Sequence, residues 1–415
     1  MGHNTTKRKI LNDPVYGFIS IYDDLLFDII EHPYFQRLRR IQQLGLTHLV
    51  YPGALHTRFQ HAIGAMHLIQ KAIEVLRLKG KNISTEEKLG ACVAILLHDI
   101  GHGPFSHTLE NSLVNNMHHE DLSTLFIDAL NKEFNGKLEI GKKIFENKYH
   151  KKFLHQLVSS QLDVDRLDYL KRDSFFTGVT EGVIGSDRIL SMLDVVDDNL
   201  VVEAKGIYSI EKFIIARRLM YWQTYMHKTV LVAEYILMKI LQRAKKLSSL
   251  GVDLFATQAL KLFLKNEFTL NDFQSHPELL KEFSKLDDFD ILASLKEWMN
   301  NNDFILSFLS TSIINRKLFK IEVQDKPFSK KYILAIKKKA TIKYSLKEED
   351  IDYIVFSDVM HNHAYNPKYE TINILNKNNS VEDINKASGQ LHDQALTKVE
   401  YKHFLCYPKP LMPAL

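Results

Sequence analysis

The chain has 415 residues, of which 45% are hydrophobic and 25% are charged, as in an ordinary globular protein large enough for more than one lobe. Lysine and arginine number 54 against 50 aspartates and glutamates, and this net charge of +4 is too small to argue by itself for nucleic-acid binding. The two cysteines, Cys92 and Cys406, imply no disulfide framework. Because no secretory signal and no apolar stretch of about 18 residues is visible, we expect a cytoplasmic enzyme without a membrane anchor.

Most of the chain before residue 316 is predicted to be helical. Residues 18–22 predict a short strand, and helices are expected at 25–30 and 35–41 with a break at Pro33. The arginines on the polar side of residues 35–41 are interpreted as a solvated face. Apolar residues recur at helical spacing through 61–78, and Ser84 caps a second apolar helix that runs to residue 97. Further helices are predicted at 118–135, 152–171 and 210–245, and the helical pattern continues to about residue 309.

From Leu318 onward the pattern changes. The runs 320–323, 332–336 and 353–356 have the composition of strands. We therefore predict a mainly α fold, with a helical body over residues 1–315 and a smaller mixed α/β lobe over residues 316–415.

The stretch that says most about chemistry is LLHDIGHGPFSH, residues 96–107. An apolar helical run ends in His98 and Asp99, and the glycines and proline that follow stop the helix. A lone pair of this kind is most often a hydrogen-bonded structural pair. Here His61 upstream and Asp165 downstream supply matching groups, and a bound metal would offset the cost of burying an imidazole and a carboxylate. We therefore predict one divalent ion held by His61, His98, Asp99 and Asp165, and the residues leave its identity open between Mn, Fe, Ni, Co, Mg and Zn.

Two neutral and two anionic ligands would leave positions on a six-coordinate ion for water and a substrate oxygen. Such an ion lowers the pKa of its water and polarises a phosphoryl oxygen. Arginine suits phosphate because its planar fork offers paired donors, so Arg58, Arg166 and Arg217 are candidate phosphate contacts, although each could equally be a surface residue.

Two further histidines are candidates for proton transfer. His107 and His119 each have a carboxylate nearby in sequence, Glu110 and Glu120 respectively. Histidine titrates in the useful range, and a carboxylate partner would hold its tautomer. We predict that they deliver a proton to a leaving oxygen.

An ordered set of motifs extends beyond these residues. Its members are Asn12-Asp13-Pro14, Phe35-Gln36-Arg37-Leu38-Arg39, Gln43-Leu44-Gly45, Tyr51-Pro52-Gly53-Ala54, Arg58-Phe59-Gln60-His61, residues 98–107, Asp163-Val164-Asp165-Arg166-Leu167-Asp168-Tyr169 and Tyr225-Met226-His227-Lys228. The set resembles the HD superfamily of metal-dependent phosphohydrolases. From about residue 9 to about residue 228 it is most similar to the deoxynucleoside triphosphate triphosphohydrolases of the sterile-alpha-motif and HD-domain type.

The resemblance implies cleavage of a dNTP to deoxynucleoside and inorganic triphosphate, by attack of an activated water at the α-phosphorus. It implies the same four metal ligands, the same three arginines as triphosphate contacts, and catalytic roles for His107 and His119, with Glu110 in place of the usual aspartate. It places the substrate among Gln43, Tyr169, Asp173, Tyr225 and His102. A polar site that satisfies the 3′-OH, with a tyrosine over C2′, is a physical route to preferring deoxyribose.

The resemblance also implies a homo-oligomer, dimer or tetramer, activated by a guanine nucleotide or a dNTP. The regulatory pocket would comprise Lys9, Ile10, Asn12, Glu31, Gln36 and Arg39. Two departures bear on this pocket, since Glu31 stands where the family has aspartate and Glu203 falls where a basic phosphate contact is expected. No sterile-alpha-motif domain is recognised.

Two alternatives stay open. The HD scaffold also supports 5′-nucleotidases, cyclic-nucleotide phosphodiesterases and guanosine tetraphosphate hydrolases, because a fold does not define a function. The three arginines together with Gln43 and Tyr169 favour a triphosphate over these substrates. The second alternative is a non-catalytic protein that binds nucleotides or single-stranded nucleic acid, and the intact ligand set argues against it.

Overall fold

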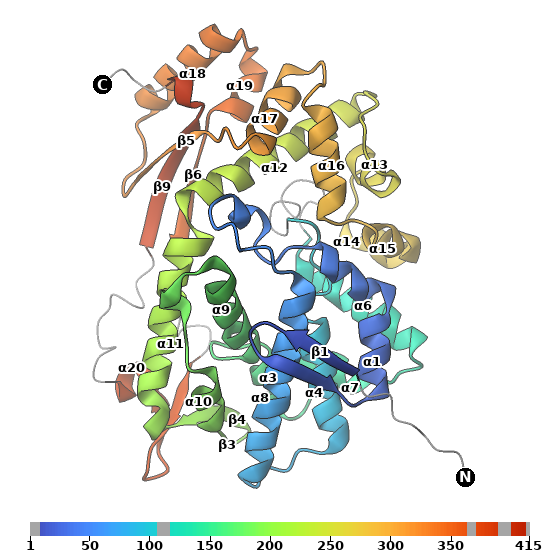
Figure 1. Cartoon of the computed structure of the whole chain (residues 1–415), viewed down its shortest axis with the longest axis vertical. Helices are drawn as coiled ribbons and strands as arrows, with labels where there is room; N and C mark the ends of the chain where they lie inside the picture. Colours follow the sequence, from blue (N-terminus) through green and yellow to red (C-terminus); the bar gives the residue numbers. More distant parts are fainter. Residues whose placement is uncertain (1–8, 106–116, 363–370, 389–399, 412–415) are drawn as a thin grey trace.

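The computed structural model describes residues 9–105, 117–362, 371–388 and 400–411. Helices dominate these ranges, which confirms the prediction of a mainly α fold. Figure 1 shows the helical body, with α3 and α4 at its centre, and a mixed region of helices and strands at the opposite end of the long axis.

The first part of the body packs around two buried helices. Its elements are α1 (Asp24–Glu31), α2 (Pro33–Gln36), a 3-10 turn (Arg37–Arg40), α3 (Arg58–Leu78), α4 (Thr85–Leu97), α6 (His119–Glu133), α7 (Glu139–Phe145), α8 (Lys152–Val158), α9 (Val164–Thr177) and α10 (Ser186–Ser191). Capping boxes begin the two central helices, with Thr57 and Gln60 at α3 and Ser84 and Glu87 at α4.

A glycine lets α9 lie close against α3. A Cβ added at Gly64 would stand 2.1 Å from both Arg172 Nη2 and Asp168 Oδ1. A side chain at this position would displace the Arg172–Asp168 pair, so Gly64 allows the close approach of the two helices here.

The prediction of one helix over 152–171 is wrong, because the structure has two helices in this region. α8 ends at Val158 and α9 begins at Val164. Asp163 explains the break, because its side chain accepts hydrogen bonds from the backbone N–H groups of Ser160 and Arg166, each at 2.7 Å. A new helix therefore starts just before Asp165.

The interpretation of the arginines in 35–41 as a solvated face is wrong for Arg37, which is fully buried. Its Nη2 donates to the carbonyl oxygens of Ile100 at 2.6 Å and His102 at 2.8 Å. Its guanidinium group also lies over the rings of Phe126 and Phe283. Arg37 thus holds the loop that follows the His-Asp pair.

The second part of the body continues as α11 (Ile207–Met220), a π-helical turn (Tyr221–Tyr225), α12 (Lys228–Ser249), α13 (Gln258–Lys265), α14 (Leu270–Ser275), α15 (Pro277–Phe283), α16 (Asp288–Trp298) and α17 (Phe304–Ile314). α11 and α12 run almost end to end along the molecule (Figure 1). The predicted helical region 210–245 is therefore interrupted only by the turn between them.

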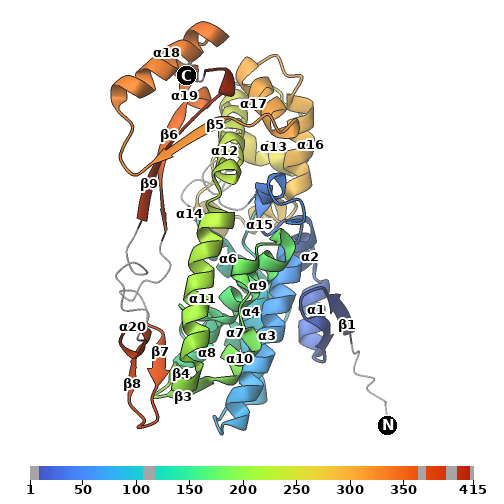
Figure 2. The ribbon, with the colours of Figure 1, turned by 60° about the vertical axis from the view of Figure 1, so that its left-hand side comes forward.

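In the described part of the chain, three small sheets accompany the helices. β1 (Lys9–Asp13) and β2 (Gly17–Ile21) form an antiparallel hairpin, with Lys9 opposite Ile21. A second sheet has the order β3 (Leu193–Val196), β4 (Asn199–Glu203), β7 (Asn373–Leu375), β8 (Val381–Asp383), in which β4 and β7 are parallel and the other neighbours antiparallel. The third has the order β5 (Lys320–Gln324), β9 (Glu400–Tyr407), β6 (Phe356–Asn362) and is antiparallel. Figure 2 shows β7, β8 and α20 (Ile384–Ala387) beside the body, far from the third sheet.

Two strand predictions after residue 316 are corrected. Residues 332–336 lie in α18 (Lys330–Tyr344), because Ser329 caps this helix and Ile336 and Ala340 bury one face at a spacing of four residues. Most of 353–356 lies in α19 (Ile351–Ile354) and the loop after it, and β6 begins only at Phe356. The prediction at 320–323 is confirmed as β5. Within the described ranges, every helix is too short or too polar to cross a membrane.

Candidate metal centre

The four predicted metal ligands converge where α3, α4 and α9 meet. His61 lies in the first turn of α3, His98 and Asp99 directly follow α4, and Asp165 lies in the first turn of α9. The Nε2 atoms of His61 and His98 are 3.3 Å apart, and Asp165 Oδ1 lies 3.1 Å from the first and 3.5 Å from the second. Asp99 Oδ1 is 3.4 Å from His98 Nε2, and Asp99 Oδ2 is 3.9 Å from His61 Nε2. Donor groups from three regions of sequence therefore come together, and ligand atoms of His61, His98 and Asp99 lie within 4.8 Å of one another.

Hydrogen bonds behind the two histidines decide which nitrogen faces this point. His61 Nδ1 donates to Asp168 Oδ2 at 2.7 Å, and His98 Nδ1 donates to the carbonyl oxygen of Ile95 at 2.6 Å. With hydrogen on Nδ1, the two Nε2 lone pairs face each other across 3.3 Å. Lone pairs at this distance repel unless a cation lies between them. The donor set therefore fits a divalent cation, and its histidines are oriented for one.

The electrostatics of the cluster favour two ionised carboxylates. Burial alone would lower the pKa of His61, but hydrogen bonds to Asp165 and Asp168 raise it to about 10. Burial would raise the pKa of Asp165, but hydrogen bonds from His61 and His98 hold it far below its usual range. The pKa of Asp99 is also well below its usual value, because the adjacent His98 outweighs burial. Without a metal, the raised pKa of His61 keeps a proton on both of its ring nitrogens. A divalent ion would replace the proton on Nε2, and its ligands would then be two anionic carboxylates and two neutral imidazoles.

Two more histidines lie beside Asp99. His102 Nε2 is 3.3 Å from Asp99 Oδ1, and the His102 and His119 rings stack with centroids 3.8 Å apart. Ligand atoms of these three residues lie within 4.8 Å of one another. Burial and the nearby Arg58 lower the pKa of His102 to about 3, so this ring is neutral. His119 Nε2 lies 3.3 Å from Glu120 Oε1, the carboxylate that the sequence pairs with it.

The three predicted phosphate contacts are found in different settings. Arg58 Nη1 donates to Asp99 Oδ2 at 2.5 Å and is buried. Arg166 pairs with Asp163, which orients its guanidinium group beside Asp165. Arg217 Nη1 donates to Gln161 Oε1 at 3.0 Å.

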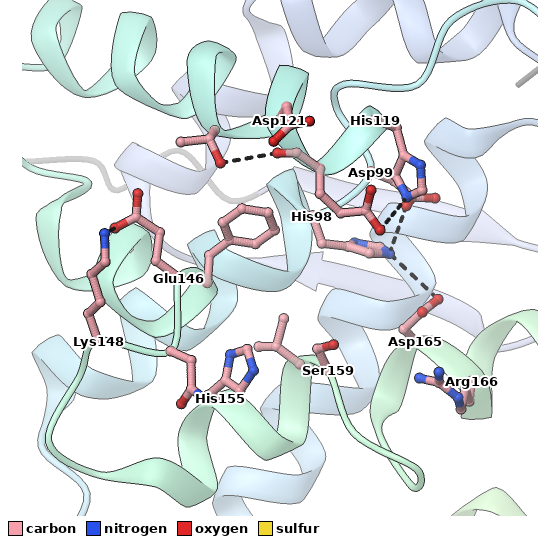
Figure 3. Close-up of a pocket in the computed structure, with 15 residues that line it drawn as sticks. His98, Asp99, His119, Asp121, Glu146, Lys148, His155, Ser159, Asp165 and Arg166 are labelled. Carbon is pink, nitrogen blue, oxygen red and sulfur yellow. Dashed lines mark hydrogen bonds and ion pairs between the residues drawn. The ribbon is translucent and has the colours of Figure 1, made fainter. Parts of the chain in front are cut away.

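Two cavities adjoin the ligand cluster. The first, of about 590 Å³, is lined by His98, Asp99, Asp165, His119 and Arg166 and extends to Lys148 and His155. Figure 3 shows His98, Asp99 and Asp165 converging on one side of it, with Arg166 beyond Asp165. The second, of about 320 Å³, has Arg58, Gln43, Phe105 and Tyr225 in its walls. Asp99 lines the first cavity and Arg58 the second, so the Arg58–Asp99 ion pair stands between the two cavities.

The predicted sugar contacts form a hydrogen-bonded group. Asp173 accepts from Tyr225 Oη at 2.8 Å and from His56 Nε2 at 2.7 Å. The rings of Tyr225 and Tyr169 meet edge to face, 6.1 Å between centroids. Burial raises the pKa of Tyr169 above its usual range, so it carries its hydroxyl proton. Gln43 lines the second cavity with Tyr225.

The regulatory candidates lie on β1, at the end of α1, on α2 and on the 3-10 turn that follows it. Lys9 on β1 pairs with Glu31 at the end of α1. Arg39 Nε donates to Gln36 Oε1 at 2.9 Å, and its guanidinium group lies over the ring of Phe59. Ile10 and Asn12 are on β1. Glu203, which stands where the resemblance predicts a basic phosphate contact, pairs with Lys79 and Lys205.

Some predictions fall outside the described residues, and some residues were missed. His107 and Glu110 lie in the segment 106–116, outside the described ranges. Asp168 was not predicted, although its place three residues after Asp165 on one helix face is a signal for an outer-shell partner. His56 had no comparable signal, because only the fold brings it to Asp173.

Fold and ligand set together define a protein of the HD type, and comparison with known proteins agrees. The model of the HD domain matches residues 58–173, and that of the HD-associated region matches residues 184–257. A phosphohydrolase from Bacteroides thetaiotaomicron VPI-5482 has a crystal structure that superposes with a TM-score of 0.94, at 49% identity over 97% of this chain and 100% of that one. The uncharacterized protein YwfO of Bacillus subtilis is 33% identical over 98% of this chain and 94% of its own length. The chain belongs to the HD-domain family of phosphohydrolases.

More distant relatives carry a specific activity in their names. The deoxynucleoside triphosphate triphosphohydrolase SAMHD1 homolog of Dictyostelium discoideum is 31% identical over 55% of this chain and 48% of its own length. The similarity thus covers about half of each protein.

Proposed function

We propose that this chain is a metal-dependent dNTP triphosphohydrolase, which converts a dNTP to deoxynucleoside and inorganic triphosphate. The observation that carries the proposal is the largely buried set of two histidines and two aspartates with a cavity on each side of the Arg58–Asp99 pair, one lined by Arg166 and His119 and the other by Gln43 and Tyr225. A substrate lying across this pair would place phosphates on one side and a nucleoside on the other. The names of the SAMHD1 relatives support the same substrate class.

Each part of the site has a role in this reaction. A bound divalent ion would lower the pKa of a water molecule and polarise a phosphoryl oxygen. Arg58 and Arg166 would bind phosphate oxygens, and because Asp99 and Asp163 already orient them, little side-chain entropy would be lost. The water oxygen bonds to the α-phosphorus as the bond to the 5′-oxygen breaks. His119, beside Glu120, would deliver the proton that the leaving 5′-oxygen needs.

The nucleoside end explains a preference for deoxyribose. Gln43, Tyr169 and Asp173 would satisfy a 3′-hydroxyl, and Tyr225, held by Asp173, would pack on the sugar at C2′ and leave little room for a second hydroxyl. A site built in this way discriminates through unsatisfied polar groups and steric contact when ribose is bound.

The experiment that tests the proposal is product analysis. Protein loaded in turn with Mn, Fe, Co, Ni, Mg or Zn is incubated with each dNTP, with GTP, and with a mixture of dNTPs as activators. Deoxynucleoside plus intact triphosphate is the expected result, with GTP cleaved far more slowly. If the product is orthophosphate or pyrophosphate, the protein catalyses another of the HD-type hydrolyses. If no product forms under any condition, a non-catalytic nucleotide-binding protein is favoured.

Regulation is part of the same proposal. The residues Lys9, Ile10, Asn12, Glu31, Gln36 and Arg39 would bind an activating guanine nucleotide or dNTP in a dimer or tetramer. Light scattering with and without dGTP tests this, and a monomer in both conditions would contradict it.

A further inference from the structure

A buried carboxylate outside both family-matched segments bonds to two loops of the second cavity. Asp288, the first residue of α16, is 3% exposed. Its Oδ2 accepts from the backbone N–H of Gln42 at 2.8 Å, and its Oδ1 accepts from the backbone N–H of Phe105 at 3.2 Å. One loop precedes α3 and the other follows the His-Asp pair of α4.

Both loops supply walls of the cavity of about 320 Å³, through Gln43 next to Gln42 and through Phe105 itself. Phe105 has a φ of 51°, a left-handed conformation that non-glycine residues rarely adopt. Such a backbone persists only where the surroundings hold it. The hydrogen bond from its N–H to Asp288 is one such restraint.

The start of α16 does not need Asp288 as a cap. Asp287 is the N-cap, and its Oδ1 accepts from the N–H of Phe289 at 3.0 Å, while Asp290 completes a capping box. Burial raises the pKa of Asp288 to about 7, although the two backbone N–H groups oppose this. A carboxylate that is costly to bury and is not required by its own helix calls for another role.

A carboxylate suits this position because each of its oxygens accepts one N–H. An amide of the same shape has one acceptor, and its NH₂ group would meet the second N–H as a donor against a donor. We propose that Asp288 is a positioning residue for the nucleoside part of the substrate, fixing the Gln43 loop and Phe105 relative to each other. The inference rests on the proposed function, in that it takes the second cavity to hold the nucleoside.

The test compares Asp288→Asn with Asp287→Asn, a matched change one residue away that keeps a helix-capping side chain. We would measure kcat and KM for dNTPs, dNTP affinity by calorimetry, bound metal and Tm. Leaving one backbone N–H unsatisfied at the cavity wall should raise KM and weaken binding by about 10-fold in Asp288→Asn. Bound metal and kcat should stay near wild type, and Asp287→Asn should leave KM unchanged.

Asp288→Glu is the second variant, because it keeps both acceptor oxygens on a longer arm and should raise KM less than Asp288→Asn does. If Asp288→Asn does not fold, the KM of Asp288→Glu provides the test. An unchanged KM in the folded variants, or an equal rise in Asp287→Asn, would overturn the inference.

The calorimetry separates this inference from the proposed function. If the wild type binds dNTPs but releases no triphosphate, the proposed reaction is wrong. If binding is also weaker in Asp288→Asn, the positioning role of Asp288 still stands. A wild type that binds no dNTP would overturn both.

Discussion

Two buried arginines in different parts of the molecule make the same set of hydrogen bonds. Arg172 on α9 grips both oxygens of Asp168, each at 2.9 Å, and its third nitrogen donates to Asp13 at 2.7 Å. Arg243 on α12 grips both oxygens of Asp303, at 3.0 and 2.5 Å, and its third nitrogen donates to Asp350 at 2.7 Å.

The difference lies in what each aspartate touches. Asp168 also accepts from His61, so Arg172 acts through Asp168 on a candidate metal ligand. Asp303 caps α17 and Asp350 precedes α19, so Arg243 joins the helical body to the region after residue 316. The same set of hydrogen bonds supports the candidate metal centre in the first case and joins two regions of the molecule in the second. Mutations should therefore separate metal binding from stability.

The largest effect is expected at the ligands themselves. His98→Ala removes a donor atom that lies 3.3 Å from His61 Nε2. The loss of metal affinity and of phosphohydrolase activity should exceed the roughly 100-fold that is usual for outer partners. Metal analysis after dialysis and product assays would measure both. If His98→Ala retained full activity and bound metal, the reaction would have to take place at another site.

Arg172→Ala should affect both metal binding and stability. Without Arg172, Asp168 loses its charge partner and no longer holds His61 in place, so metal affinity should fall about 10- to 100-fold. Leaving Asp168 and Asp13 buried without their partner should cost about 3–5 kcal/mol of unfolding free energy. Competition with a chelator and denaturant unfolding test these two results, and normal metal affinity would show that Asp168 orients His61 unaided.

Arg243→Ala should lower the stability of the protein without affecting metal binding or activity. The cost should be about 3 kcal/mol, at the low end for a buried pair because Arg243 is 9% exposed. Activity per folded molecule and bound metal should equal those of wild type. Arg243→Lys, which keeps the charge but not the fork, serves as the control and should lose less. A loss of metal in Arg243→Ala would break the comparison.

The smallest expected effect is on how the stability of the protein depends on acidic pH. Burial would raise the pKa of Asp303, but the hydrogen bond from Arg243 outweighs it and the pKa lies below the usual 3.8. Its contribution to stability is therefore complete above about pH 4 and is lost as the pH falls through the lowered pKa. Tm measured from pH 6 to pH 3 should fall less steeply in Arg243→Ala than in wild type. Parallel curves would mean that Asp303 gains nothing from Arg243.

The metal cluster was the part of the site most open to prediction. His61, His98, Asp99 and Asp165 stand in motifs whose chemistry shows in the sequence, and the structure brings them within ligand distance. Arg37 and Asp288 could not be found in this way. Their partners are backbone groups far along the chain, and a side chain that bonds to backbone leaves no pattern of residue types.

The errors in the fold have related causes. Residues 332–336 have strand-like composition, and only the cap at Ser329 and the burial of Ile336 and Ala340 favour a helix. β3 and β4 were missed because strands of four and five residues give too little alternation to read. The division at residue 315/316 stays a prediction, and the structure adds that β7 pairs with β4 of the body.

That pairing of β4 with β7 has a consequence for how the chain is made. During synthesis, β4 and its hairpin partner β3 leave the ribosome long before residues 373–375 do. Until then one edge of β4 offers unpaired N–H and C=O groups, which any extended peptide could occupy. Closing a parallel pair across so much chain is slow compared with forming helices. The nascent protein therefore has a long interval in which its helices can be complete while this strand edge needs protection from neighbouring chains.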